Sequence, residues 1–364
     1  MTAVHMDLID RKVTRSSSPK TLIHLGQALR GLTAELHNDS ADLSLVFFTV
    51  GLLAYHDLDE QRMAAIYSTQ PLQFVPLVQS PQNLQVFLQL GYNLAHAQAK
   101  HSLIHQLGGL DKLSIPGLGA AAAYLEMCNA SKLYQCPRYD NFWHTERFVD
   151  IMRGTSGVNE PHPTSVATGR GFFLYAQPGL TAPMLSILIQ FSAVNERLKH
   201  ESVTETGTVL DSTQRVQRLR NKLQYQLLSL PTWDDLDSEK QKASTRHVYD
   251  CVRLAAVIYS NAVLLALPHH TGWHTALALR LRDLIDIDDW RDDPSTHPVL
   301  LWILTVGGIA ADRSEDRTFY EDHLSELLRM MDSPSWKAVE RTLEGFLWSR
   351  EACKHGAAML WQSL

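Results

Sequence analysis

Apolar residues recur every three or four positions along most of this sequence, with polar residues between them. Within residues 22–36 this spacing places a series of leucines on one helical face: Leu22, Leu25, Leu29, Leu32 and Leu36. Residues 254–267 are apolar around the whole circumference of a helix, which is typical of a central buried element, and residues 298–311 form another apolar helix. No segment combines sustained alternation with many β-branched residues, as strands do. The sequence therefore predicts an all-α protein.

The predicted helices form a single large multi-helix domain over residues 21–364, preceded by a flexible segment of residues 1–20. A long helix through residues 84–94 continues to about Gln106, where Gly108-Gly109 stops it, because glycine readily adopts the left-handed C-cap conformation. Residues 137–183 differ from the rest, since their prolines and glycines are too dense for regular structure. We interpret this region as a loop-rich insert, and long irregular segments inside compact domains are usually functional or disordered.

Composition narrows the function classes. The 364 residues are 45% apolar and 20% charged, and the net charge is -6 with no basic block, which argues against direct DNA binding. The four cysteines, at positions 128, 136, 251 and 353, are too scattered for a zinc cluster and fit a reducing intracellular compartment, cytoplasmic or nuclear. The N-terminus lacks an apolar signal core, and the longest apolar run is too short to span a bilayer, so we expect no membrane association.

An aspartate-rich run at residues 288–292 contains the pattern D-D-x-x-D. On a helix, Asp288, Asp289 and Asp292 would lie together, and their carboxylates would suit Mg²⁺ holding a diphosphate group. Two prolines soon after the run favour a loop instead, and no second metal-binding motif follows at the usual spacing. The alternative interpretation is a solvated acidic helix end.

The densest mixture of aromatic and titratable side chains follows Pro137. Tyr139 and His144 are candidate general acid–base groups, because burial can tune such pKa values toward neutrality. Trp143 is a candidate wall of an apolar pocket, and His105 and Trp302 are further candidate ligand-binding residues. The alternative is that these aromatic side chains simply pack on the core.

Two blocks of sequence carry a resemblance to a known family. The first, within residues 94–139, contains H-x-x-I-x-x-L-G-G-L at 101–110, an alanine-rich helix and C-P-R-Y at 136–139. The second, within residues 289–361, contains H-P-V-L-L-W at 297–302 and G-G at 307–308. Together they resemble the regulatory domain of fungal-specific transcription factors, which follows a zinc-cluster DNA-binding module. The resemblance implies a helical fold, a fungal source and an aspartate run that serves as a connecting loop.

The sequence departs from the family pattern at two points. The DNA-binding module of the family has six closely spaced cysteines that hold two zinc ions, whereas the first cysteine here is Cys128. With the first helix starting by about residue 20, we expect no such module and no direct DNA binding. The block before Gly108-Gly109 also lacks the arginine that the family usually has there.

These observations favour a small-molecule-binding protein of fungal secondary metabolism, foremost a cofactor-independent cyclase or pericyclase that acts on an apolar polyketide or terpenoid. A pre-shaped apolar cavity would hold the substrate in a reactive conformation, and one or two hydrogen-bond donors would stabilise developing charge, with no cofactor. We expect the cavity between residues 254–267, residues 301–306 and the irregular segment after Pro137.

Two other functions stay open. One is a transcriptional regulator-like protein that senses a hydrophobic metabolite or pairs with a full-length regulator. The other is a Mg²⁺-dependent prenyl-diphosphate enzyme that uses the aspartate run. For the two small-molecule binders the expected partner is a hydrophobic small molecule, and the chain is a candidate homodimer.

Overall fold

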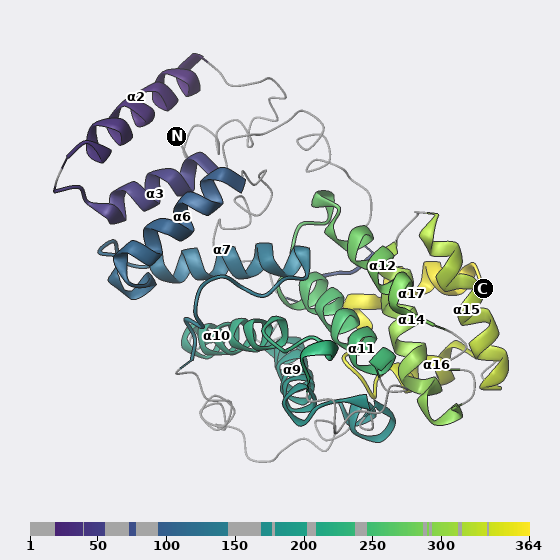
Figure 1. Ribbon diagram of the computed structural model, residues 1–364. Coiled ribbons are helices and arrows are strands. Elements are labelled where there is room, and N and C mark those ends of the chain that lie inside the picture. Colours follow the sequence, from purple (N-terminus) through teal and green to yellow (C-terminus); the bar gives the residue numbers. More distant parts are fainter. Residues whose placement is uncertain are drawn as a thin grey trace. The chain divides into compact units, whose positions relative to one another are not determined.

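The computed structural model of the chain (Figure 1) describes residues 19–38, 40–54, 73–77, 94–144, 169–176, 179–201, 209–236, 246–286, 290, 293–311, 315–332 and 335–364. The chain divides into two compact units. Unit 1 comprises Met1–Gln70, Pro81–Glu126 and Arg138–Phe142, and unit 2 comprises Pro71–Ser80, Met127–Pro137 and Trp143–Leu364. The single domain expected over residues 21–364 stays a prediction, and most of the N-terminal segment of residues 1–20 lies outside the described ranges.

Every regular element in the described ranges is a helix, which confirms the predicted all-α class. In unit 1 the elements are α2 (Pro19–Leu36), α3 (Leu43–Ala54), α6 (Leu94–Leu107), a 3-10 turn (Leu110–Lys112) and the first half of α7 (Leu118–Leu133). Helix α3 packs against both α2 and α6. The predicted stop after α6 is also confirmed, because Gly108 and Gly109 follow it with φ of 82° and 134°, values that favour glycine.

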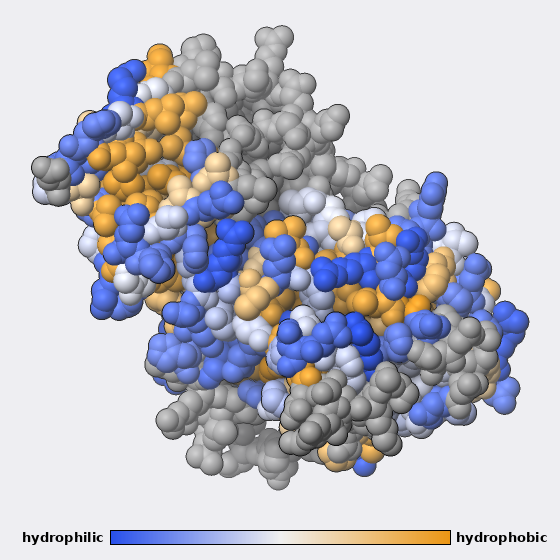
Figure 2. Space-filling model, in the orientation of Figure 1, coloured by the Kyte–Doolittle hydropathy of each residue, from blue (hydrophilic) through white to orange (hydrophobic). Residues whose placement is uncertain are grey.

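The predicted leucine face of α2 is only partly covered. Exposed apolar side chains on α2 and α3 include Ile23, Leu29, Leu36, Leu45 and Phe48. Figure 2 shows apolar side chains gathered over this part of unit 1. Helical periodicity therefore predicted the helix correctly but overestimated its burial, because Leu25 and Leu32 are half-buried and Leu29 and Leu36 are exposed.

Unit 2 is centred on α11 (Arg246–Tyr259), the π-helix that continues it (Ser260–Leu264) and α14 (His297–Ala311). Around them lie α9 (Ala182–Glu201), α10 (Val209–Leu228), α12 (Trp273–Leu284), α15 (Asp316–Met330), α16 (Trp336–Leu343) and α17 (Arg350–Gln362). Short helices join them at Phe172–Ala176, Trp233–Asp235, His269–Thr271 and Pro294–Thr296. Helix α14 packs against α11, α12, α15, α16 and α17, so it forms the hub of this unit.

The predicted central helix over residues 254–267 is buried at every position. It is not a uniform α-helix, however, because its hydrogen bonding changes to the π pattern at Ser260. Four buried polar side chains meet there. Gln224 donates to the Ser131 hydroxyl at 2.6 Å, Ser260 donates to Gln224 Oε1 at 2.7 Å, and the Ser131 hydroxyl donates to Asn261 Oδ1. Since these groups are fully buried, their mutual hydrogen bonds are what make their burial tolerable.

Helix α14 is buried along nearly its whole length, and its paired glycines let neighbouring side chains reach the backbone. A Cβ atom on Gly307 would lie 2.3 Å from Cε1 of Tyr320, and one on Gly308 would lie 2.9 Å from Cδ2 of Leu360. The Tyr320 hydroxyl also donates to the carbonyl oxygen of Ala278 at 2.6 Å. The glycine pair therefore fixes α15 and α17 against α14.

Residues 294–311 are the one stretch of the described sequence with the length and hydropathy of a membrane span. In unit 2, 78% of that stretch is buried, as expected of a core helix.

The predicted loop-rich insert of residues 137–183 is described only in part. Residues 145–168 and 177–178 lie outside the described ranges. Within the remainder, Phe172–Ala176 forms a π-helix and α9 begins at Ala182.

Candidate functional site

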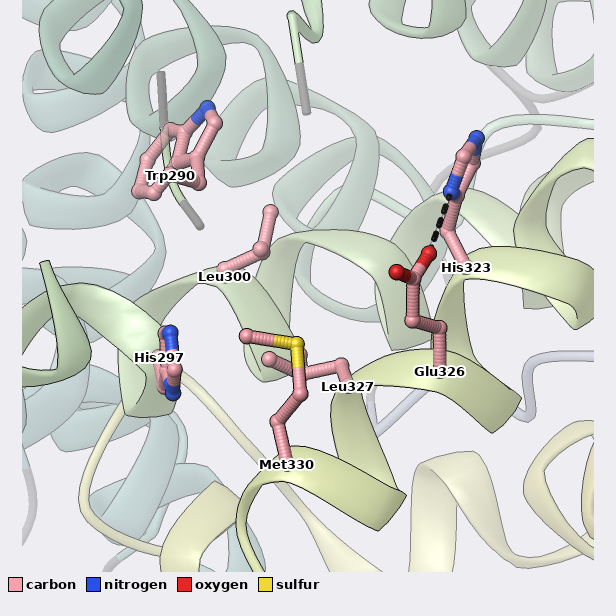
Figure 3. Close-up of a pocket in the computed structure, with 7 residues that line it drawn as sticks. All are labelled: Trp290, His297, Leu300, His323, Glu326, Leu327 and Met330. Carbon is pink, nitrogen blue, oxygen red and sulfur yellow. Dashed lines mark ion pairs between the residues drawn. The ribbon is translucent and has the colours of Figure 1, made fainter. Parts of the chain in front are cut away.

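A pocket in unit 2 lies between the start of α14 and the second half of α15 (Figure 3). Its walls are Trp290, His297, Leu300, His323, Glu326, Leu327 and Met330. The cavity volume is about 10 Å³, which is room for one water-sized group. Together with its open mouth, the space between the walls is about 250 Å³.

Helical spacing explains why these residues share one pocket. On α15 the four lining residues stand at i, i+3, i+4 and i+7 (positions 323, 326, 327 and 330), which places them on one face. On α14, His297 and Leu300 stand three residues apart at the first turn. Because α14 packs against α15, the two faces meet and enclose the pocket.

A capped turn leads into α14 beside the pocket. Asp293 accepts hydrogen bonds from the backbone N–H of Ser295 at 3.0 Å and from its hydroxyl at 2.6 Å, and so caps the 3-10 turn that leads into α14. Pro294 occupies the first position of that turn, where its missing N–H is harmless. The expectation that the aspartate run is a connecting loop stays a prediction, because Trp290, the described residue within the run, is helical and most of the run lies outside the described ranges. The proposed magnesium ligands Asp288, Asp289 and Asp292 lie outside the described residues.

Two polar atoms in the pocket walls are buried and have no hydrogen-bond partner among the residues that the structure describes. They are Nε1 of Trp290 and Nε2 of His297, whose side chains are only 2% and 6% exposed at the residue level. An unpaired buried polar group destabilises a fold by about 1–3 kcal/mol. Nε1 of Trp348 and Nε2 of His355, which do not line the pocket, are also buried with no partner among the described residues, so this feature is not confined to the pocket.

The rim of the pocket carries charge. Nδ1 of His323 lies 3.9 Å from Oε2 of Glu326, and the Glu326 side chain is 39% exposed. The ring of His323 also packs edge-on against Phe319, with centroids 4.4 Å apart. The pair is therefore a loose surface contact, attractive only when the imidazole is protonated.

The chemistry that this pocket supports is recognition. The Trp290 indole can only donate a hydrogen bond, whereas an imidazole nitrogen can donate or accept. No cluster of three or more His, Cys, Asp or Glu side chains suited to a metal ion occurs among the described residues. The volume is also far below the several hundred Å³ of a pocket that engulfs a drug-sized molecule. This pocket can hold a small polar group, but it does not enclose a whole polyketide or terpenoid.

The candidate residues that the structure describes are divided between the two units, and none of these lines the pocket. In unit 1, Tyr139 is buried and its ring stacks near that of His101, 5.9 Å away, while His105 is exposed on α6. In unit 2, Trp143 is buried and His144 is exposed, with its carbonyl oxygen accepting a hydrogen bond from the amino group of Lys222 at 3.4 Å.

Trp302 is fully buried in unit 2, and packing accounts for its surroundings. Its indole N–H donates to the carbonyl oxygen of Leu347 at 2.9 Å. Its ring stacks on Phe346 at 5.8 Å and meets Phe172 edge-on at 5.1 Å. The contacts of Trp302 are thus those of a core side chain whose polar atom is satisfied. A role for it in ligand binding stays a prediction.

Sequence reasoning did not select Trp290, His297 or the polar face of α15. Two signals were present. His297 opens the apolar helix that carries the family resemblance, and His323 and Glu326 share a helical face with apolar residues. Neither signal shows that the two faces meet, because that contact joins segments far apart in the chain.

The described part of the chain is an all-helical fold with a small pocket beside α14. The chain belongs to the fungal specific transcription factor domain family, whose profile matches residues 1–352. No curated protein and no solved structure matches the chain. No zinc-cluster domain is found in this sequence. The resemblance inferred from the two sequence blocks is therefore confirmed.

Family membership changes the balance between the functional hypotheses. It supports the regulatory alternative, and neither the fold nor the comparisons support a cyclase. A transcription factor domain acts inside the cell, in agreement with the expected intracellular location.

Proposed function

We propose that this chain is a regulatory domain that changes transcription in the nucleus of a fungal cell according to whether a small molecule occupies the pocket beside α14. The family match supports the regulatory part of the proposal. The observation that carries the ligand-dependent part is the pair of buried, unpartnered polar atoms on Trp290 and His297. Neither atom is exposed in this structure, so a ligand would have to open the junction of α14 and α15 to reach them, and its hydrogen bonds would then offset a penalty that the free protein bears.

The position of the pocket suits such a role. It lies at the junction of α14 and α15, and α14 contacts five other helices of unit 2. A ligand that binds one arrangement of this junction better than another would shift the balance between them. Ligand binding would therefore change the conformation of the surface through which the chain contacts the transcription machinery.

DNA contact is not part of the proposed role of these residues. The net charge is -6 and the cysteines are too widely spaced for a zinc cluster, so the chain offers little to attract a phosphate backbone. The chain would reach a promoter through another polypeptide segment or through a regulator with which it pairs. A second copy of this chain is one such partner.

Fusion of the chain to an unrelated DNA-binding domain in a yeast reporter strain tests the proposal. We expect the fusion to change reporter transcription several-fold relative to the DNA-binding domain alone. We further expect that change to respond to an organic extract of a fungal culture. The Trp290→Phe variant should lose the response, because it removes one of the two unpartnered polar atoms.

Trp348→Phe is the matched control, since Trp348 is also buried with an unpartnered indole N–H but does not line the pocket. This variant should keep the response. A fusion that behaves like the DNA-binding domain alone would refute the regulatory role. A response that is unchanged in Trp290→Phe would refute the role of the pocket. Conversion of an extract component to a new product by the purified chain would favour the cyclase instead.

A further inference from the structure

We propose that a second copy of this chain covers the exposed apolar face of α2 and α3, and that the two copies pair with their leucine-rich α2 helices side by side. This pairing goes beyond the proposed function, because it concerns a surface of unit 1 and not the pocket in unit 2. Four features of the face support it: the spacing of its leucines, their exposure, the charges around them and the size of the face.

The leucines of α2 repeat with the period of a coiled coil. They stand at positions 22, 25, 29, 32 and 36. Their intervals of three, four, three and four residues are those of the heptad repeat, in which positions a and d form the seam between two helices. A helix that packs on a globular core usually has a wider apolar face than this narrow seam. The spacing therefore indicates that α2 pairs with another helix of the same kind.

Unit 1 itself covers the seam only in part. No described side chain of α2 is buried, and Leu29 and Leu36 are 45% and 58% exposed. On α3, Leu45 and Phe48 stand three residues apart and are 46% and 41% exposed. Figure 2 shows apolar side chains together on this part of the surface. Single exposed leucines are common, whereas a cluster on two neighbouring helices is typical of an interaction surface.

Helix α2 depends on such a contact for its stability. Gly26 and Gly31 lie within it, and glycine has a low helix propensity. Most of the stability of a helix in a protein comes from the packing of its apolar face. Because that face of α2 is incompletely packed in a single chain, a second copy would stabilise the helix.

The turn between α2 and α3 holds the face in one shape. Oε1 of Glu35 accepts a hydrogen bond from the backbone N–H of Asp42 at 2.8 Å. Oδ1 of Asp42 in turn accepts from the backbone N–H groups of Ser44 at 2.9 Å and Leu45 at 3.3 Å, at the start of α3. A face that is already ordered loses less conformational entropy when it binds a partner.

The charges around the seam permit pairing with an identical chain. In coiled coils, charged residues at the flanking e and g positions select the partner. With residue 22 at position a, the flanking positions of α2 are occupied by Gly26, Ala28, Thr33 and Glu35. The first three are uncharged, and the Glu35 carboxylate already accepts a hydrogen bond within its own hairpin. These positions therefore neither repel an identical helix nor select a partner of opposite charge.

The size of the face suits a reversible dimer. Helices of 18 and 12 residues are about 27 Å and 18 Å long, and each is about 10 Å wide. Two copies of this face would form an interface of roughly 900 Å², which is small for a specific complex. We therefore expect a dimer that dissociates on dilution, with a dissociation constant in the micromolar range.

Leu29 is the best position for a test, because it is the central leucine of the five. In a two-fold pair centred on the seam, the middle of one α2 meets the middle of the other, whether the helices run parallel or antiparallel. Leu29→Glu would therefore place two carboxylates together. A mixture of Leu29→Glu and Leu29→Lys would instead place opposite charges together.

Sedimentation equilibrium of the full chain over a range of concentrations measures the pairing. We expect a monomer–dimer equilibrium for the wild type and a dissociation constant about a hundredfold higher for Leu29→Glu, and likewise for Leu29→Lys, because like charges meet in each. The equimolar mixture should form a heterodimer about tenfold tighter than either variant alone. Since Leu29 is exposed in a single chain, far-UV circular dichroism of the monomers should be unchanged.

Leu279→Glu is the matched control, since Leu279 is a similarly exposed leucine, 38% exposed, on α12 of unit 2. This variant should pair like the wild type. A wild-type chain that stays monomeric, an equal loss of pairing in Leu279→Glu, or a mixture that pairs no better than its components would each overturn the proposal. Binding of a monomeric chain to anionic lipid vesicles, lost in Leu29→Glu, would assign the face to a membrane surface instead. A monomer that still changes reporter transcription would refute the pairing but not the proposed function.

Discussion

Unit 2 contains two groups of buried polar side chains that differ in how they are satisfied. Around the π-helix, Ser131, Gln224, Ser260 and Asn261 hydrogen-bond to one another and are closed off from solvent. Beside α14, by contrast, Trp290 and His297 each hold a buried polar atom with no partner in the described part of the chain. A network in which every polar group has a hydrogen-bond partner stabilises one arrangement of helices. Two polar groups without partners can instead form hydrogen bonds to another molecule. Buried polar side chains are thus structural in the first group and candidates for binding in the second.

The largest expected effect comes from breaking the satisfied network with Asn261→Leu. Leucine has the same number and branching of side-chain heavy atoms but cannot accept from Ser131 or Gln224, nor donate to the Ser131 carbonyl oxygen. We expect a loss of about 3–4 kcal/mol in the free energy of unfolding, because several buried groups lose partners together. Urea denaturation measures it.

A double-mutant cycle sharpens this result. Adding Ser131→Ala removes one of the groups that Asn261→Leu leaves unpaired, so the double variant should lose less than the sum of the two single variants. Strict additivity would show that Ser131 and Asn261 are not coupled.

Unit 1 provides an intermediate case, a buried charge that is incompletely compensated. Lys100 is 6% exposed and its amino group lies 5.3 Å from the Phe47 ring centroid. Burial lowers the pKa of Lys100 to about 8, and the charge of Glu126 opposes that shift. Between that value and the ordinary pKa of 10.5, the unfolded chain binds more protons than the folded chain, so stability rises with pH.

We therefore expect the stability of the wild-type chain, relative to Lys100→Met, to increase by about 2 kcal/mol between pH 7 and pH 9.5. Methionine has a similar length but no charge, so the comparison cancels the titration of other groups. Chemical denaturation at several pH values measures it, and a difference that is constant with pH would contradict the burial of the Lys100 charge.

The next prediction compares two buried tryptophans directly. Trp302→Phe removes a hydrogen bond to the Leu347 carbonyl oxygen, whereas Trp290→Phe removes an indole N–H that has no protein partner. Both substitutions also remove side-chain volume. We expect Trp302→Phe to cost about 1–2 kcal/mol more in unfolding free energy, because it leaves an acceptor unpaired. Equal losses of unfolding free energy in the two variants would mean that both indole N–H groups have hydrogen-bond partners of similar strength in solution.

The smallest expected effect is that of Glu326→Gln. The contact with His323 is 3.9 Å long and partly exposed, so its loss should change stability by less than about 1 kcal/mol. Thermal unfolding checks this. A large loss would mean that Glu326 has a structural role.

The sequence predicted the helices better than it predicted the site. The spacing of apolar residues identified α2 and α14, and the paired glycines identified the end of α6. These features depend on local pattern, which a single sequence contains. The change to π-helical geometry at Ser260 was missed, because it accompanies hydrogen bonds between distant segments.

The pocket was missed for a related reason. His297 and His323 are 26 positions apart in the numbering (323 − 297), and only the packing of α14 on α15 brings them to the same cavity. The aromatic cluster after Pro137 attracted attention because its residues are neighbours in sequence. Proximity along the chain is a weak guide to a site that is assembled from two helices.

The close approach of Tyr320 to Gly307 determines which wall of the pocket can yield. Tyr320 precedes His323 by one turn, and its ring and hydroxyl anchor α15 to two neighbouring helices. The part of α15 one turn before His323 is therefore held in place, while Met330, two turns beyond His323, lies exposed. Any opening of the pocket should accordingly begin at the last turns of α15, where a side chain can move without disturbing the contacts of Tyr320.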